Sequence, residues 1–134
     1  MSAEKYILPD RAAWLVARKN HIGGSDAAAC VGRSPHKDNV QLWEEKMGLV
    51  LPEDISDKEY VRYGTEAEKY LRGLFALDFP KYQVLYDENN MFLNPDFPWM
   101  HASLDGELMD RQGRHGILEI KEHFTKLPEE KLGG

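Results

Sequence analysis

Apolar residues recur at helical spacing through the first part of the chain. The steps of three and four residues are longest over 57–78, which predicts a long helix there. A shorter helix is predicted over 11–20, where Asp10 suits the N-cap position. Another is predicted over 39–47, and Gly48 suits its end.

After Pro80 the pattern changes to short stretches typical of strands. Strands are expected over 82–87 and 90–94, with a turn between them and a loop over 94–99. Two further segments, 101–109 and 115–123, are expected to pair as antiparallel strands. Helices followed by strands favour an α+β fold, with N-terminal helices packed on a small, mainly antiparallel sheet.

The sequence "DRQGR" between the last two strands suits a three-residue hairpin loop with Gly113 in the left-handed conformation. That loop places Asp105 directly opposite Glu119, with Lys121 on the same face. Directly opposite residues have Cβ atoms about 4.5–5.5 Å apart. A register slip of one residue would separate these three side chains.

Two adjacent carboxylates and a lysine suit metal-dependent hydrolysis of a phosphodiester. Asp105 and Glu119 would repel each other, and a divalent cation relieves that repulsion. Oxygen ligands favour Mg²⁺ or Mn²⁺, which lowers the pKa of a bound water. Lys121 could orient that water. The alternative stays open, because a Glu-x-Lys pair on a strand is commonly a solvated surface pair.

Composition sets outer limits on the function. A chain of 134 residues fits one domain, 1–134, with a helical part over about 8–79 and a sheet part over about 80–124. The net charge of −6 argues mildly against coating nucleic acid through bulk positive charge. The single cysteine, Cys30, suits a reducing cytosol. No apolar run reaches the roughly 18 residues of a membrane span.

Five segments in order along the chain resemble one family of nucleases. They read "WLVARKNHIGGSDAAACVG", "NVQLWEEKMG", "VRYGTEAEKYLRGLF", "HASLDGEL" and "GILEIK". They resemble the lambda exonuclease group, or YqaJ-type viral recombinases, within the PD-(D/E)xK nuclease superfamily. The resemblance implies a restriction-endonuclease-like core.

The resemblance implies roles for the acidic residues. Asp105 and Glu119 match the metal-binding carboxylates, and Lys121 matches the catalytic lysine. Glu68 matches a further metal-binding and catalytic glutamate, in the pattern Gly64-x-x-x-Glu68. On the helical pattern alone, Glu68 borders the buried face but would also suit an ordinary surface acid.

Arg18 and Ser25 match family positions that hold the 5′-terminal phosphate of a DNA strand. An arginine fork and a helix start both suit phosphate oxygens. The alternative is that Ser25 only caps a short helix and Arg18 lies on the surface. Trp14, Trp43 and Trp99 are expected in the core rather than as platforms for bases.

Two departures separate this chain from the family pattern. Leu104 stands where the family motif usually has proline before its aspartate. The family also continues well past the Glu-x-Lys strand, so the chain is expected to be a C-terminally truncated fragment or a short relative.

The resulting hypothesis is a Mg²⁺- or Mn²⁺-dependent DNA exonuclease of phage recombination, cutting 5′ to 3′ from duplex ends. The alternatives are a truncated relative that binds DNA ends without cutting, and an inhibitory or structural protein that contacts another protein. DNA is the expected partner. A homo-oligomer and a single-strand annealing protein are further partners implied by the resemblance, and a bacterial cytoplasm is the expected location.

Overall fold

The computed structural model describes residues 3–51 and 58–122 of the 134-residue chain. Its elements, in chain order, are β1 (Glu4–Ile7), α1 (Arg11–Lys19), the 3-10 helix η1 (Gly24–Asp26), α2 (Ala27–Cys30), α3 (Asn39–Lys46), α4 (Glu59–Asp78), β2 (Gln83–Leu85), β3 (Asn90–Asn94), β4 (Phe97–Ala102), β5 (Gly106–Met109) and β6 (His115–Leu118).

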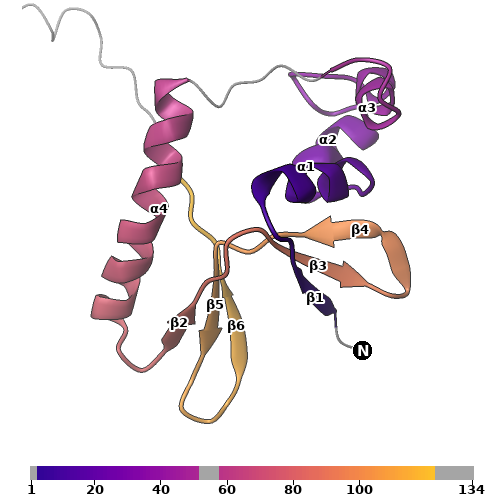
Figure 1. Cartoon of the computed structure of the whole chain (residues 1–134). Coiled ribbons are helices and arrows are strands. Elements are labelled where there is room, and N and C mark those ends of the chain that lie inside the picture. Colours follow the sequence, from indigo (N-terminus) through magenta and orange to yellow (C-terminus); the bar gives the residue numbers. More distant parts are fainter. Residues whose placement is uncertain (1–2, 52–57, 123–134) are drawn as a thin grey trace, which may run out of the picture.

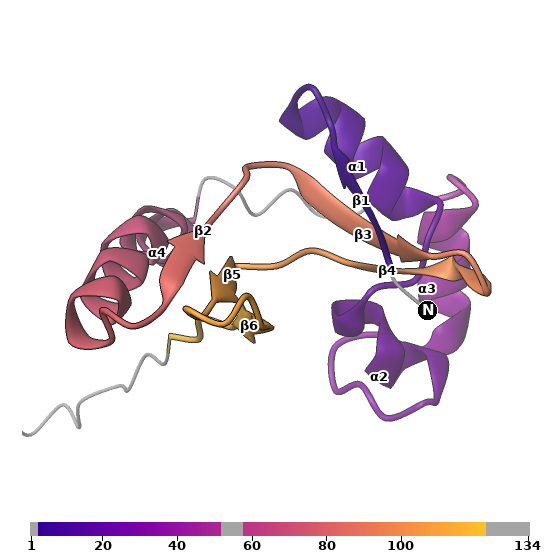
Figure 2. The ribbon, with the colours of Figure 1, turned by 90° about the horizontal axis from the view of Figure 1, so that it is seen from below.

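The elements form two lobes, each around a three-stranded sheet (Figure 1). The α1 lobe contains the sheet β1-β3-β4 with helices α1, α2 and α3. The α4 lobe contains the sheet β2-β5-β6 with helix α4. Figure 2 shows the lobes apart, joined by the segments that run from β2 to β3 and from β4 to β5. All the strand pairs are antiparallel, so the expected α+β fold is confirmed.

The predicted helix ends are confirmed by their caps. The carboxylate of Asp10 accepts a hydrogen bond of 2.7 Å from the Ala13 N–H at the start of α1. Gly48 follows α3 with a φ of +77°, a conformation that favours glycine. The helix predicted over 57–78 is found as α4, which runs from Glu59 to Asp78. Residue 57 lies outside the described residues.

The hairpin of β5 and β6 has the predicted register, with Gly106 opposite Leu118 and Met109 opposite His115. Gly113 has a φ of +80°, as the predicted loop requires. Strand β6 nevertheless ends at Leu118, so the expected strand is too long over 119–122, and His123 lies outside the described residues. Beyond Leu118, the backbone bonds to a side chain instead of to a partner strand.

One continuous sheet was expected, and two sheets are found. Residues 97–99 begin β4 rather than forming a loop, and β1 was not predicted. The side chains of β1 are all exposed, so no alternating pattern marks this strand in the sequence. Strands β2 and β3 are consecutive but belong to different sheets, because β2 pairs with β5 and β3 pairs with β1 and β4.

Two other sequence expectations are wrong. Ser25 does not cap a helix, because it lies inside η1, whose N-cap is Gly23. Trp43 and Trp99 are not core residues, since both side chains are exposed. Helix α3 buries Leu42 instead of Trp43, and Trp99 lies edge-on to Phe97 on β4.

The buried side chains gather in the α1 lobe. They are the apolar Ala29, Leu42 and Met91 and the polar Asp26 and Asn90. Helix α4 buries no residue fully. The α1 lobe therefore has a small core, whereas the described part of the α4 lobe packs only half-buried faces together.

Candidate active site

Glu68 and Asp105 lie close together where helix α4 meets the start of β5. Both side chains are half-buried. Burial raises the pKa of Glu68, and the negative charge of Asp105 raises it further. These two carboxylates are therefore near enough to repel each other, and both were predicted for the site.

The backbone around Asp105 fixes its carboxylate. Its Oδ2 accepts a hydrogen bond of 2.9 Å from the N–H of Ile120. Its carbonyl oxygen accepts a hydrogen bond of 3.0 Å from Arg72 Nη1. Asp105 thus contacts both the end of β6 and helix α4, which explains how one residue joins the hairpin to the helix.

Arg72 was not predicted as part of the site. Its mostly buried guanidinium lies 3.7 Å from the centre of the Tyr86 ring and 3.8 Å from Glu68 Oε2. It opposes the effects that raise the pKa of Glu68. Arg72 follows Glu68 by four residues, a spacing that places two side chains on one helix face. That spacing was the available signal in the sequence.

Glu119 and Lys121 form a second, more exposed pair just beyond β6. Lys121 Nζ lies 3.8 Å from Glu119 Oε1, and the two side chains are 73% and 68% exposed. The main chain of this segment reaches the site through the bond from Ile120 to Asp105. The carboxylate of Glu119 points to its lysine neighbour rather than joining Glu68 and Asp105 in a metal-binding group.

Glu122 is an additional acidic residue near the site that was not predicted. Its Oε2 lies against Gly64 on α4, where an added Cβ would come within 2.7 Å. Its charge also contributes to the raised pKa of Glu68. The glycine in the Gly64-x-x-x-Glu68 pattern therefore leaves room for a carboxylate beside the helix.

The carboxylates provide the right type of ligand for a hard divalent cation but do not form a complete set. Among residues 3–51 and 58–122, no three Asp, Glu, His or Cys side chains are grouped closely enough to hold a metal ion. Glu68 and Asp105 supply two oxygen donors whose mutual repulsion a cation would relieve. A third donor would require another carboxylate, such as the half-buried Glu122 or the exposed Glu119, to turn toward these two.

Arg18 and Ser25, the pair expected to hold a phosphate, contact each other in the α1 lobe. Arg18 Nη2 donates a hydrogen bond of 2.7 Å to Ser25 Oγ. The guanidinium also lies 5.3 Å from the centre of the Trp14 ring. Ser25 is exposed and Arg18 is half-buried, so this pair presents two polar groups at the surface of a packed lobe.

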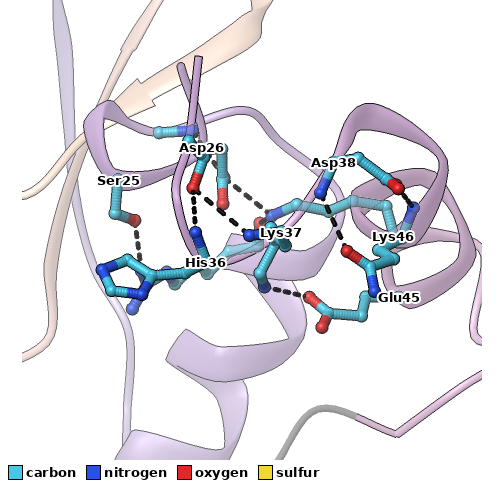
Figure 3. A network of polar contacts seen from close by, with 11 residues as sticks. Ser25, Asp26, His36, Lys37, Asp38, Glu45 and Lys46 are labelled. Carbon is cyan, nitrogen blue, oxygen red and sulfur yellow. Dashed lines mark hydrogen bonds and ion pairs between the residues drawn. The ribbon is translucent and has the colours of Figure 1, made fainter. Parts of the chain in front are cut away.

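An ion pair between the half-buried Lys46 and the buried Asp26 stabilises the segment that contains Arg18. Figure 3 shows Lys46 reaching from α3 toward Asp26, and its Nζ lies 3.0 Å from Asp26 Oδ2. Lys46 also donates to the carbonyl oxygen of Arg18. Burial alone would raise the pKa of Asp26, but the N–H of Gly23 and the charge of Lys46 outweigh it, so the pKa is lowered.

His101 on β4 lies near the charged groups of Arg18, Lys46 and Asp26. Both of its ring nitrogens are buried, and neither has a hydrogen-bond partner within the described ranges. Burial lowers the pKa of His101, and the nearby charges of Arg18 and Lys46 lower it further. A Cβ at Gly23 would lie 2.5 Å from His101 Nε2, so the glycine permits this close packing. The position of His101 next to these cations therefore disfavours protonation of its ring.

Comparison with known proteins decides the family. Residues 13–133 match the family described as YqaJ-like viral recombinase domain. The chain belongs to this family. The match includes Arg18, Ser25, Glu68, Asp105, Glu119 and Lys121. The YqaJ-like assignment confirms the resemblance found in the sequence.

A relative from Bacillus subtilis (strain 168), named Uncharacterized protein YqaJ, is 29% identical to the chain over 108 residues. The similarity covers 81% of this chain and 32% of the relative. The chain thus spans about a third of the length of that protein. No solved structure matches the chain. No helix within the described residues is both long and apolar enough to cross a membrane.

Proposed function

We propose that this YqaJ-like domain is a Mg²⁺- or Mn²⁺-dependent deoxyribonuclease that hydrolyses phosphodiesters of DNA in phage recombination. The observation that supports this most directly is that Arg72 Nη1 contacts both Glu68, at 3.8 Å, and Asp105, at 3.0 Å, with Lys121 three residues beyond the end of β6. Family membership supports a role in recombination. A phage or prophage protein of this kind would act in the cytoplasm of its bacterial host.

Asp105 and Glu68 would hold the cation, and Glu119 would complete the oxygen ligands after a side-chain rotation. When bound, the cation would neutralise phosphate charge and lower the pKa of a water. Lys121 would orient this water or stabilise charge on the phosphate. Arg72 would keep Glu68 ionised and directed at Asp105, since it contacts the side chain of one and the carbonyl of the other.

Arg18 and Ser25 would bind the terminal 5′-phosphate of the strand that is cut. Arginine offers phosphate a rigid set of donors, and the 2.7 Å hydrogen bond already orients the guanidinium toward the hydroxyl. Holding the 5′ end in the α1 lobe, with the carboxylates in the α4 lobe, would select duplex ends and a 5′ to 3′ direction. This direction rests on the family resemblance.

A module that binds DNA ends without cutting them is the second candidate. The exposed position of Glu119 favours it, because this carboxylate pairs with Lys121 instead of joining Glu68 and Asp105. A homo-oligomer or a single-strand annealing protein are partners that the family resemblance suggests for either candidate.

Cutting of end-labelled linear duplex tests the choice between them. The unmodified chain is incubated with Mg²⁺, with Mn²⁺ and with EDTA, beside Lys121→Ala and the control Lys69→Ala. Lys69 is an exposed lysine that pairs with Glu66 on α4, so its loss removes the same charge away from the site. We expect weak, metal-dependent cutting that Lys121→Ala abolishes and Lys69→Ala retains.

The cutting should be weak because Glu119 points to Lys121 and not to the other two carboxylates. Misplacement of a reacting group by about 1 Å can lower a rate on the order of a hundredfold. Equal cutting by Lys121→Ala and the unmodified chain would remove Lys121 from the mechanism. Complete inactivity at high protein and Mn²⁺ concentrations would favour the end-binding module.

A further inference from the structure

Asn90 is a buried polar residue at the junction of the two lobes. It is the first residue of β3 and is 5% exposed. Its Nδ2 donates to the carbonyl oxygens of Asp87, at 2.7 Å, and of Leu104, at 3.0 Å. Its Oδ1 accepts a hydrogen bond of 2.8 Å from the N–H of Leu104. The two carbonyls fix the orientation of the amide, because only the nitrogen can donate to them.

These bonds tie together two segments that connect the lobes. Residues 86–89 join β2 to β3, and residues 103–105 join β4 to β5. The Asn90 side chain bonds to the first through Asp87 and to the second through both backbone polar groups of Leu104. Leu104 immediately precedes Asp105, so the paired backbone fixes the peptide from which that carboxylate projects.

The main chain of Asn90 extends the connection into the α1 lobe. Its carbonyl oxygen accepts hydrogen bonds from Trp14 Nε1, at 3.1 Å, and from Ser103 Oγ, at 2.8 Å. The Trp14 ring in turn lies beneath the guanidinium of Arg18. One residue therefore contacts both the platform of the Arg18–Ser25 pair and the peptide that precedes Asp105.

We infer that Asn90 is a positioning residue that sets the spacing between the Arg18–Ser25 pair and Asp105. The inference rests on the proposed function and adds to it, because it explains how a bound 5′ end and the carboxylates are kept in register. Leu104 makes this possible in part, since its N–H donates to Asn90 and a proline at that position would have no N–H.

The substitution Asn90→Asp tests the spacing with little change in shape. Aspartate retains an acceptor for Leu104 but loses both donations to the connecting segments. Asn94→Asp is the matched control, because Asn94 lies at the other end of β3, where its Oδ1 accepts a hydrogen bond of 2.9 Å from the N–H of Asp96. Circular dichroism checks that each variant is folded.

The measured quantity is the preference for a 5′-phosphorylated duplex over a 5′-hydroxyl duplex, with and without saturating Mn²⁺. All proteins carry Lys121→Ala, so that binding is measured without cutting. Correct spacing lets a duplex engage both sites together, so Mn²⁺ should increase the preference about fivefold in this background. We expect Asn90→Asp to remove the increase and Asn94→Asp to keep it. Mn²⁺ affinity, measured by calorimetry, should fall about tenfold in Asn90→Asp alone.

A folded Asn90→Asp chain with unchanged Mn²⁺ affinity and an unchanged increase would overturn the inference while leaving the proposed function intact. If the parent chain binds no Mn²⁺ or shows no phosphate preference, the proposed function fails, and the inference fails with it. Should Asn90→Asp not fold, Trp14→Phe replaces it, because this change removes the indole N–H that donates to the Asn90 carbonyl and to Ser103 Oγ but keeps an aromatic ring beside Arg18. It should abolish the Mn²⁺-dependent increase, and retention of the increase would overturn the inference.

Discussion

The α1 lobe and the α4 lobe are each built on three antiparallel strands, with three α-helices in the first and one in the second, yet they are stabilised differently. The α1 lobe contains Ala29, Leu42 and Met91 as buried apolar side chains and an ion pair to the buried Asp26, whereas α4 buries no residue fully. The polar pair of the α1 lobe is already hydrogen-bonded, at 2.7 Å. The carboxylates of the α4 lobe converge only in part. The proposed phosphate site would therefore use a preformed surface, whereas the proposed metal site would need a third oxygen donor to move toward Glu68 and Asp105.

The largest expected effect concerns the proposed metal site of the α4 lobe. Asp105→Ala should abolish Mn²⁺ binding in calorimetry, a loss of more than about a hundredfold, because a direct ligand matters more than its supporting groups. Asp96→Ala removes an exposed carboxylate on the β3–β4 turn and serves as the control. Unchanged binding in Asp105→Ala would place the cation elsewhere.

The next largest difference is expected in the free energy of unfolding, between a substitution in the α1 lobe and one in the α4 lobe. Leu42 is 4% exposed and Leu77 is 75% exposed. Leu42→Ala should lower the free energy of unfolding by about 2–5 kcal/mol, since it leaves a cavity. Leu77→Ala on α4 should change it by less than about 0.5 kcal/mol. Urea unfolding of both variants measures the difference, and equal effects would refute the contrast in packing.

Removal of Arg18 should have a smaller effect, limited to the end of the DNA. Loss of one charge-assisted contact costs about 1.5–3 kcal/mol, or about ten- to a hundredfold in affinity. Arg18→Ala should therefore bind a 5′-phosphorylated duplex more weakly and leave binding of a 5′-hydroxyl duplex nearly unchanged. A parent chain with no preference for the phosphate would exclude this role for the α1 lobe.

The smallest predicted effect is a pH dependence confined to the α1 lobe. The pKa of His101 is lowered in the folded chain by burial and nearby cations. Stability should be complete above the ordinary histidine pKa of about 6.5 and should fall as the pH drops from there toward the lowered value, because the unfolded chain binds the proton more readily. His101→Phe should flatten urea midpoints across this range.

His36→Asn is the control, since the His36 side chain is exposed. A pH dependence that persists in His101→Phe would assign the effect to another group. The aromatic replacement should fold well, because neither nitrogen of the His101 ring has a hydrogen-bond partner in the described structure.

Features encoded by neighbouring residues could be predicted from the sequence. The Asp10 cap and the 106–118 register each depend on residues within a few positions of one another or on one loop, and both are confirmed. The pairing of β1 with β3 could not be predicted, because it joins segments more than 80 residues apart and β1 carries no alternating pattern.

In the candidate site, too, some features could be predicted from the sequence and others could not. Glu68 could be placed in the site with Asp105 from the family resemblance and the helical pattern, and the raised pKa of Glu68 is consistent with that placement. The outward position of Glu119 could not be predicted, because it depends on where β6 ends. That end is set by the bond between Ile120 and the Asp105 side chain, a local competition between a carboxylate and the sheet ladder.

Lys5 makes the junction between the lobes responsive to its solvent. Its Nζ lies 2.6 Å from Asp87 Oδ2 and 2.5 Å from Glu107 Oε2, so one ammonium on β1 joins the β2–β3 connection to strand β5. Dissolved ions screen such partly exposed pairs, over about 10 Å at 0.1 M salt and about 3 Å at 1 M. Raised ionic strength should therefore weaken this ion-pair link between the lobes, in addition to weakening the proposed contact with a DNA phosphate.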